Sequence, residues 1–432
     1  MSPFCKRQLC FILYAFLIIC SREAYGQSIT TRNTDNEILN SNIEEGLLEK
    51  NPFYRFETPI KAGSFLLYPV LTLEGRYTDN VLATANDTQP DFSVSTKPQL
   101  IIEKNLGRHK FDLNINAEAE RFAKTTSENE ENYDVKFKGL LEAKQDLLFP
   151  ITAQYTIDHQ DRRDSSTAIL TENRLEQERA YFSGGVIYRP NRLRLQFVGS
   201  YAALRFENDT LRSNGNTYFR EDSNRNVIKA EATASYQMRP NFTPFISVTH
   251  QQEKFLKRQR TTTGFNGRDN SNTLLRTFLG TRIDYKDLIG GRIALGYDMR
   301  DYEEAEDDQN LSAYLNLDWN ISPRSTLFLD ASRISTTDNE IVSGLVRSSL
   351  GIDYQYEIKR DLFFNANAGY SLLEFNTGDR EDTITDFGVG LKYISGPRWR
   401  LGLDYQFNDR TSDVSAVEQT ENLILLQLIG AL

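Results

Sequence analysis

The chain has 432 residues, 39% of them hydrophobic, and a formal net charge of −10. Its mean hydropathy of −0.51 excludes a bundle of membrane-spanning helices, which would need several long apolar segments. The acidic balance argues against a nucleic-acid-binding protein, because such proteins present basic surfaces to phosphate groups. A chain of this length suits either two or three soluble domains or one large β-barrel.

The first residues predict a cleaved secretory signal peptide over residues 1–26. Basic residues precede an apolar stretch at residues 9–19, and the small residues Ala24 and Gly26 occupy the cleavage positions. The apolar stretch is too short to serve comfortably as a membrane anchor. We therefore expect the mature chain to be exported.

All three cysteines, Cys5, Cys10 and Cys20, precede this cleavage site. The mature chain would then have no disulfide, no Cys-ligated metal and no Cys nucleophile. A lipid-attachment site at Cys20 is the alternative processing signal. It is disfavoured because the preceding residue, Ile19, is bulky where such a site has a small residue.

Residues 27–63 form a polar segment without sustained alternation, which predicts a flexible periplasmic lead. Residues 35–50 could form a short helix, with Asp35 as its cap and a rough apolar stripe. Two other roles stay open for this segment: a plug that enters the barrel, or a docking segment for a periplasmic partner.

Residues 64–432 predict an all-β fold, a transmembrane antiparallel β-barrel. At residues 401–408, apolar side chains at every second position alternate with polar ones, as in a strand with one apolar and one polar face. A closed sheet with an apolar outer face and a hydrated inner face satisfies this pattern. The same alternation recurs at residues 111–119, 293–299 and 311–319.

Two kinds of connection separate the predicted strands. Eight short turn signals, rich in Gly, Pro, Asn and Asp, lie at residues 106–108, 148–150, 189–191, 239–241, 288–291, 322–324, 359–361 and 396–398. Nine longer polar stretches lie at residues 84–90, 125–131, 161–171, 208–220, 257–270, 303–308, 336–339, 378–382 and 411–417. Short periplasmic turns and longer extracellular loops are typical of outer-membrane barrels, and these connections predict about 18 strands, with 16 as the alternative.

Aromatic residues cluster beside the short turns, where a girdle at the membrane interface is expected. Ordinary strand propensity, which also favours aromatics, is the alternative explanation. The residues are Phe149, Tyr188, Tyr236, Phe242, Tyr285, Trp319, Tyr393 and Trp399.

The sequence contains no recognisable catalytic motif. Its three histidines are His109, beside a short turn, and His159 and His250, which the alternation places on the outer face. Neither a place beside a turn nor a place on the outer face suits a catalytic base that would serve a hydrated interior. We therefore predict that the protein is not an enzyme and requires no cofactor or metal.

Charged residues on the polar faces are expected to line a water-filled lumen. Each one alone is more simply explained as part of a mutually paired, solvated wall, but together they predict an interior with both signs of charge. The lumen-lining candidates are Asp112, Glu118, Glu120, Arg192, Arg194, Arg292, Asp298, Arg300, Asp318, Arg400 and Asp404.

The motif Tyr77-Thr78-Asp79-Asn80, which closes a Pro-containing first strand, resembles a family of outer-membrane β-barrels associated with capsular and exopolysaccharide biosynthesis. The segment 351–412 is similar as well. The resemblance implies a role in export or surface assembly of polysaccharide, with polysaccharide and periplasmic export components as partners besides lipid and lipopolysaccharide. It implies no catalytic residues. The chain departs from a common barrel pattern by ending in Leu432 rather than in an aromatic residue.

Two alternatives to polysaccharide export follow from the same barrel. A general diffusion porin for small solutes would use the wet lumen, and a structural or adhesive barrel would act through its loops. The sequence does not encode an oligomeric state in any visible pattern.

Overall fold

The computed structural model describes residues 59–164, 171–260, 267–286, 288–337, 344–376 and 380–431. The predicted signal peptide and most of the predicted periplasmic segment, residues 27–58, lie outside the described residues. No helix among the described residues is long and apolar enough to cross a membrane.

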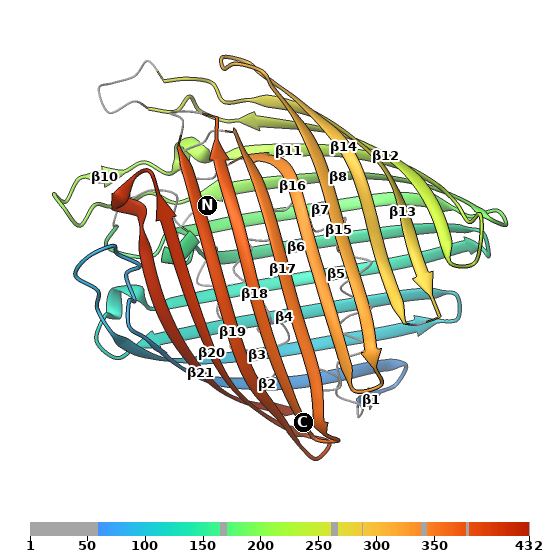
Figure 1. Cartoon of the computed structure of the whole chain (residues 1–432), viewed down its shortest axis with the longest axis horizontal. Helices are drawn as coiled ribbons and strands as arrows, with labels where there is room; N and C mark the ends of the chain where they lie inside the picture. Colours follow the sequence, from blue (N-terminus) through green and yellow to red (C-terminus); the bar gives the residue numbers. More distant parts are fainter. Residues whose placement is uncertain are drawn as a thin grey trace.

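Eighteen long antiparallel strands form one sheet in the described part of the chain, and the last strand pairs with the first, which closes the barrel (Figure 1). The prediction of an all-β transmembrane barrel with about 18 strands is thereby confirmed. The strands are β2 (Phe65–Thr78), β3 (Asp91–Leu106), β4 (His109–Phe122), β5 (Glu130–Lys144), β6 (Leu147–His159), β7 (Glu176–Tyr188), β8 (Leu193–Phe206), β11 (Arg225–Tyr236), β12 (Phe242–Phe255), β13 (Asn272–Tyr285), β14 (Ile289–Tyr302), β15 (Asp308–Ser322), β16 (Ser325–Thr337), β17 (Gly344–Lys359), β18 (Leu362–Phe375), β19 (Glu381–Ser395), β20 (Trp399–Ser412) and β21 (Gln419–Ala431).

Short elements complete the fold. The strand β1 (Ile60–Ala62) folds back on the start of β2. In the loop after β8, β9 (Asp209–Thr210) pairs with β10 (Thr217–Tyr218). Four short 3-10 helices lie in the described loops: η1 (Thr126–Glu128), η2 (Arg162–Asp164), η3 (Glu221–Ser223) and η4 (Ser415–Val417).

The two ends of the barrel differ in their connections. At the turn end most hairpins are tight, and at the loop end the longer connections gather (Figure 1). Gly396 illustrates the turn chemistry: its φ of +75° lies in the left-handed region, which glycine adopts without steric cost. Near-wall strands such as β18 cross far-wall strands such as β5 at a steep angle in this view, as tilted strands of a barrel must.

Two of the predicted turns are misplaced. The turn predicted at residues 148–150 is wrong, because β6 begins at Leu147 and Pro150 lies inside it. Proline lacks the N–H that a strand ladder needs, and the ladder between β6 and β7 is interrupted between Leu148 and Ile151. The turn predicted at 288–291 also lies too far along the chain, since β14 begins at Ile289.

The outer face is apolar and the inner face polar. Leu295 and Leu311 are 69% and 72% exposed on the outside, whereas Arg300 and Gln427 on the inside are 0% and 1% exposed. An outer face of this kind satisfies lipid, while closure of the sheet satisfies the backbone hydrogen bonds. All eight aromatic residues predicted for the girdle are exposed.

The motif Tyr77-Thr78-Asp79-Asn80 lies where β2 meets β21. The Asp79 carboxylate accepts hydrogen bonds from the backbone N–H of Asn422 at 2.8 Å and from its side-chain amide at 2.7 Å. The Asn80 amide donates to the carbonyl oxygen of Thr420 at 3.0 Å. These bonds join the first strand to the last, so the motif has a constructional role in closing the barrel.

Candidate functional site

The predicted lumen-lining residues occupy five strands and one turn. Strand alternation places them opposite the exposed apolar face, except that Arg192 lies in the turn before β8 and is itself exposed. The remaining ten are Asp112, Glu118 and Glu120 on β4, Arg194 on β8, Arg292, Asp298 and Arg300 on β14, Asp318 on β15, and Arg400 and Asp404 on β20.

These residues do not form one cluster. Glu118 pairs with Lys97 at 2.9 Å, Asp298 pairs with Arg276 at 2.7 Å, and Arg400 donates to the carbonyl oxygen of Gly396 at 2.7 Å. The interior is instead organised in sectors along the strands.

One sector, on β17–β20, has a flat polar wall. A methyl group at Gly369 would overlap the carboxylate of Asp386, and one at Gly390 would overlap the carboxylate of Asp404. These carboxylates therefore lie along the wall over glycines. The carboxylates thus occupy the space that a side chain at either glycine position would need.

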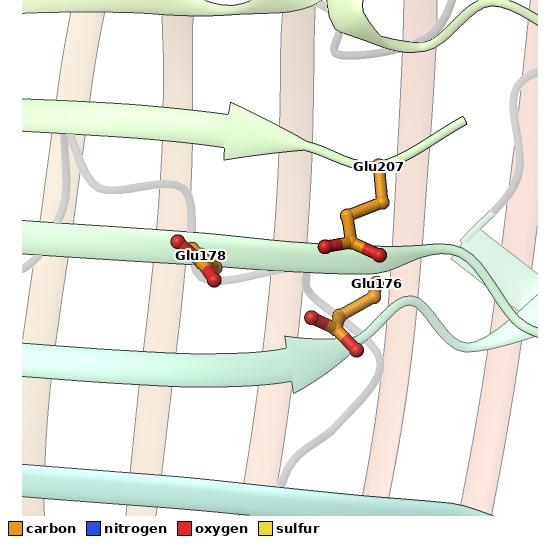
Figure 2. A group of neighbouring side chains, drawn as sticks. All are labelled: Glu176, Glu178 and Glu207. Atoms are coloured by element: carbon orange, nitrogen blue, oxygen red, sulfur yellow. The ribbon is translucent and has the colours of Figure 1, made fainter. Parts of the chain in front are cut away.

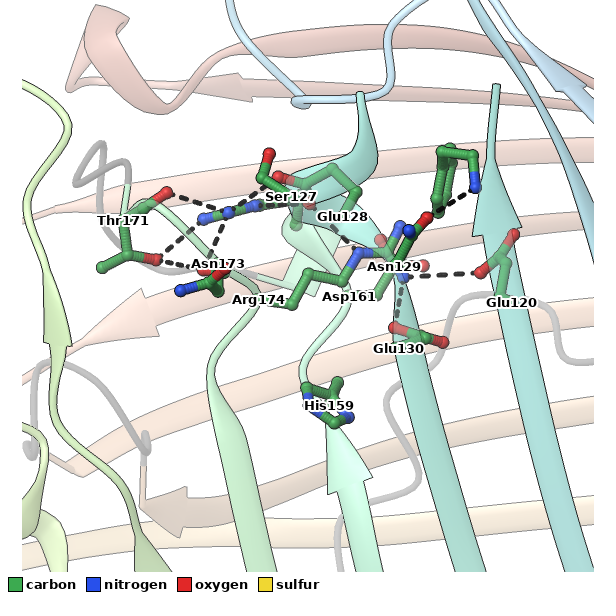
Figure 3. Close-up of polar contacts among 12 residues, drawn as sticks. Glu120, Ser127, Glu128, Asn129, Glu130, His159, Asp161, Thr171, Asn173 and Arg174 are labelled. Carbon is green, nitrogen blue, oxygen red and sulfur yellow. Dashed lines mark hydrogen bonds and ion pairs between the residues drawn. The ribbon is translucent and has the colours of Figure 1, made fainter. Parts of the chain in front are cut away.

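At the loop end, three loops meet on the carboxylate of Glu128 in η1 (Figure 3). Glu128 is 0% exposed. Its two oxygens accept bonds from Arg162 at 2.9 and 3.0 Å, from Arg174 at 3.2 Å and from Arg212 at 2.7 Å. Because Arg162 and Arg174 come from the loop after β6 and Arg212 comes from the loop after β8, one buried carboxylate holds three loops together. We call the described residues of loops 123–129, 160–175 and 207–224 the loop collar.

The loop collar reaches inward as far as the junction between the first and last strands, β2 and β21. Arg163 lies 3.3 Å from Glu421 of β21, and its carbonyl oxygen accepts a bond of 2.9 Å from Gln419. Asp161 lies 2.6 Å from Arg163 and 3.7 Å from Arg76 of β2. Since β2, β3, β4 and β5 lie between β21 and β6 in the sheet, this loop bends across the inner wall.

Further ion pairs join the loop collar to the next loops. Glu221 pairs with Lys257 at 2.6 Å and with Arg260 at 2.8 Å, and Arg258 contacts Glu304. Exposed pairs of this kind contribute about 0–1 kcal/mol each. The buried cluster at Glu128 is therefore the energetic centre of the collar.

A second element, which we call the inward hairpin, is formed by the described ends of β16 and β17 at residues 334–337 and 344–346. Pairing of β15 with β16 ends at Arg333, whereas pairing of β16 with β17 continues to Thr337. All of these residues are buried. The prediction of an extracellular loop at 336–339 is therefore wrong for its first two residues, which continue β16.

Three charged residues anchor the inward hairpin to β13 and β14. Arg276 donates to both oxygens of Asp298, at 2.7 and 2.8 Å, and to the carbonyl oxygen of Ser335 at 2.7 Å. The N–H of Ser335 donates to Asp298 at 3.0 Å. Arg300 donates to Thr337 at 2.9 Å. The hairpin is thus held inside by buried charge-assisted hydrogen bonds, which are stronger than neutral ones.

Sequence reasoning named Asp298 and Arg300 as interior residues but missed Arg276 and the anchors of the loop collar. Glu128 and Arg162 lie in stretches predicted only as polar loops, Arg174 follows the predicted loop 161–171, and neither Arg174 nor Arg276 was among the candidates. The one signal in the sequence was the density of arginines in residues 162–174, which is unusual for a loop that is simply exposed to solvent. The sequence does not indicate which carboxylate they meet.

Acidification should loosen the loop collar through Asp161. Burial raises the pKa of this loop carboxyl, but the guanidinium of Arg163, aided by Arg76 and Arg174, outweighs burial and holds the pKa well below its usual range. A depressed pKa stabilises the docked loop above the ordinary aspartate value of about 4, and this stabilisation is lost as the pH falls toward the depressed pKa. We expect larger, noisier single-channel currents below about pH 4, recorded in a titration from neutral to acidic pH.

The control for this titration is Asp161→Asn. Its currents at neutral pH should already resemble those of the acidified wild type, and acid should change them less. A wild-type conductance that stays constant through this pH range would contradict the role of Asp161.

Three carboxylates on the outside approach one another near the loop end, those of Glu176, Glu178 and Glu207 (Figure 2). Each has an oxygen within 4.8 Å of the others. Figure 2 shows them on β7 and on the segment that follows β8. Clusters of accessible acidic groups are common without an ion, so we assign no metal site to them.

Fold and interior together define a transmembrane β-barrel of the bacterial outer membrane, with an apolar belt outside and charges inside. The family described as "Putative beta-barrel porin 2" matches residues 57–431, and the chain belongs to this family. No curated protein matches the chain.

Several solved outer-membrane barrels are similar in fold. OpdK of Pseudomonas aeruginosa with vanillate is 14% identical, with a TM-score of 0.46 over 85% of this chain and 98% of that one. A BenF-like porin from Pseudomonas fluorescens is 11% identical, with a TM-score of 0.47 over 86% and 99%. A mutant ferric enterobactin receptor, PfeA, from Pseudomonas aeruginosa is 9% identical, with a TM-score of 0.45 over 87% and 81%. These likenesses extend to the barrel fold and no further.

Proposed function

We propose that the protein is a passive channel through which small hydrophilic solutes diffuse across the outer membrane. The observation that carries this proposal is a closed barrel whose inner face carries many polar and charged side chains, while its outer face suits lipid. Membership of a porin family supports it. The eleven predicted interior residues belong to this proposal as the lining of the pathway or as anchors of its walls.

The loop collar and the inward hairpin set the size of solute that we expect to pass. Both bring buried side chains into the loop end of the interior, at Glu128 and at Ser335. A wide, empty mouth would favour passage of a polymer, whereas an interior filled at one end favours small molecules. We therefore expect a size limit in the range of mono- and disaccharides.

The proposal is tested by swelling of liposomes that contain the refolded mature protein, in isosmotic solutions of neutral sugars. Swelling should be fast with a pentose, slower with a disaccharide and minimal with a tetrasaccharide. Equal swelling with all sugars would contradict the size limit. No swelling above that of protein-free liposomes with any sugar would contradict the channel itself.

Export or surface assembly of polysaccharide stays a prediction of the resemblance at residues 77–80. That motif joins the first and last strands, so it is explained by barrel construction and adds nothing specific about polysaccharide. Periplasmic export components as partners rest on the same resemblance. A deletion strain whose surface polysaccharide is unchanged would end this second proposal, and the adhesive alternative would be tested by deleting loops.

We propose lipid and lipopolysaccharide as the surroundings of the outer face. Apolar residues such as Leu295 and Leu311 suit acyl chains. Near the loop end, charged residues replace them on the outside, as with Arg121 and Glu131, which pair with each other. Such residues suit the charged head groups at the membrane surface.

A further inference from the structure

Three arginines of the inner face lie near the turn end of the barrel. Arg194 lies on β8, Arg282 on β13 and Arg292 on β14. Arg282 and Arg292 stand directly opposite each other on neighbouring strands. Arg282 is exposed and the other two are half-buried, so the interior solution reaches all three.

None of the three forms an ion pair in the part of the chain that the structure describes. The charges that act on Arg194 are those of Arg292, Arg189 and Arg282, all positive. Arg292 is acted on by Arg282, by the carboxylate of Glu231 and by the phenol of Tyr314. The guanidinium of Arg194 donates a hydrogen bond to the amide oxygen of Gln196, at 3.1 Å.

This arrangement costs folding energy. Like charges directly opposite each other on adjacent strands are destabilising. The arginines of the loop collar, by contrast, share the carboxylate of Glu128. Inner-face carboxylates such as Glu231 and Asp318 lie in the same sector, but among the described residues none forms an ion pair with the three arginines. An excess of unpaired positive charge attracts anions from solution.

The wall around the arginines supplies further hydrogen-bonding groups. Ser235 of β11 stands opposite Arg194, and Thr243 of β12 stands opposite Arg282. On the other side, Asn316 of β15 stands opposite Arg292. Hydroxyl and amide groups beside guanidinium groups can complete the solvation of an oxyanion.

We propose that Arg194, Arg282 and Arg292 form a binding site for the carboxylate, phosphate or sulfate group of small solutes in the channel. The proposal rests on the channel function and names the class of solute it favours. The planar guanidinium group binds such oxyanions with two parallel hydrogen bonds, which a lysine ammonium cannot do. A row of three arginines lets an anion pass from one to the next without leaving positive surroundings.

The test uses the refolded mature protein and a variant with Arg194→Gln, Arg282→Gln and Arg292→Gln. In planar bilayers under a potassium chloride gradient, the wild type should prefer chloride, and the variant should lose or reverse that preference. Sulfate and succinate, added separately, should each reduce the chloride current of the wild type and not that of the variant; block by only one of them would narrow the chemical class. Lys254→Gln, on the outer face of β12, is the control with the same kind of charge removal.

A second readout does not require conduction. Phenylglyoxal modifies accessible arginines, and sulfate or succinate should protect Arg282 from modification in the folded protein, as read by mass spectrometry. Protection without any conductance would contradict the channel and keep the anion site. Conductance with no anion preference and no protection would overturn the anion site and keep the channel.

The stability of the variant toward denaturant distinguishes a functional role of these arginines from a structural one. Because the substitutions remove repulsion, the variant should unfold at a denaturant concentration no lower than that of the wild type. A variant that fails to fold would give the arginines a structural role and overturn the proposal as stated. In that case the selectivity and protection measurements are repeated with the single variant Arg282→Gln, at the exposed position.

Discussion

Replacing Glu128 by glutamine should release the loop collar and increase the single-channel conductance. The change keeps the shape of the side chain but removes the negative charge that Arg162, Arg174 and Arg212 share. Leaving buried charges without their partner costs about 3–5 kcal/mol, far more than a surface pair contributes. The three loops should then separate from one another, and the current should rise and become noisier.

The matched control is Glu131→Gln, three residues further along the chain. Glu131 also pairs with an arginine, Arg121, but both side chains are about half exposed, at 53% and 49%. Loss of such a pair costs about 0–1 kcal/mol, so conductance should not change. Limited proteolysis of the loops gives an independent reading, with faster cleavage for Glu128→Gln alone. Equal conductance and equal cleavage in both variants would show that Glu128 does not hold the collar.

Most of the barrel could be predicted because its physics is local. An outward-facing residue such as Leu403 and an inward-facing one such as Asp404 are distinguished by the two-residue period alone, which membrane burial enforces on each strand. Loops and turns alternate because consecutive strands cross the membrane in opposite directions. The misplaced turn near Pro150 shows the limit of such rules, since proline marks a turn only when no interruption of the ladder accommodates it.

The organisation of the interior could not be predicted, because it depends on residues that are far apart in sequence. Glu128 and Arg212 are separated by four barrel strands along the chain, and Arg163 meets Glu421 only because the barrel closes. The alternation of polar and apolar residues predicts which face of the strand a side chain occupies, but it does not predict which charged residues pair with each other. The contrast between the neutralised loop end and the arginine sector at Arg282 therefore emerges only from the structure.

Replacing Asp298 by asparagine should release the inward hairpin. Asp298 is 1% exposed, accepts two bonds from Arg276 and receives the N–H of Ser335. Asparagine keeps one acceptor oxygen but not the negative charge, so the buried guanidinium of Arg276 loses its counter-charge and one of the two carboxylate acceptors. We expect a loss of about 3–5 kcal/mol in the anchoring of the hairpin. Hydrogen exchange at residues 334–337 should accelerate accordingly.

A second pair on the same part of the barrel gives the comparison. Arg333 of β16 contacts Glu374 of β18 at 2.5 Å, but their side chains are 39% and 41% exposed. Glu374→Gln should therefore leave exchange at residues 334–337 within about 1 kcal/mol of the wild type. If Asp298→Asn behaves like Glu374→Gln, the buried pair is not what holds the hairpin. If exchange accelerates only in Asp298→Asn and the conductance rises with it, the hairpin narrows the pathway, and the loop end has two independent constrictions.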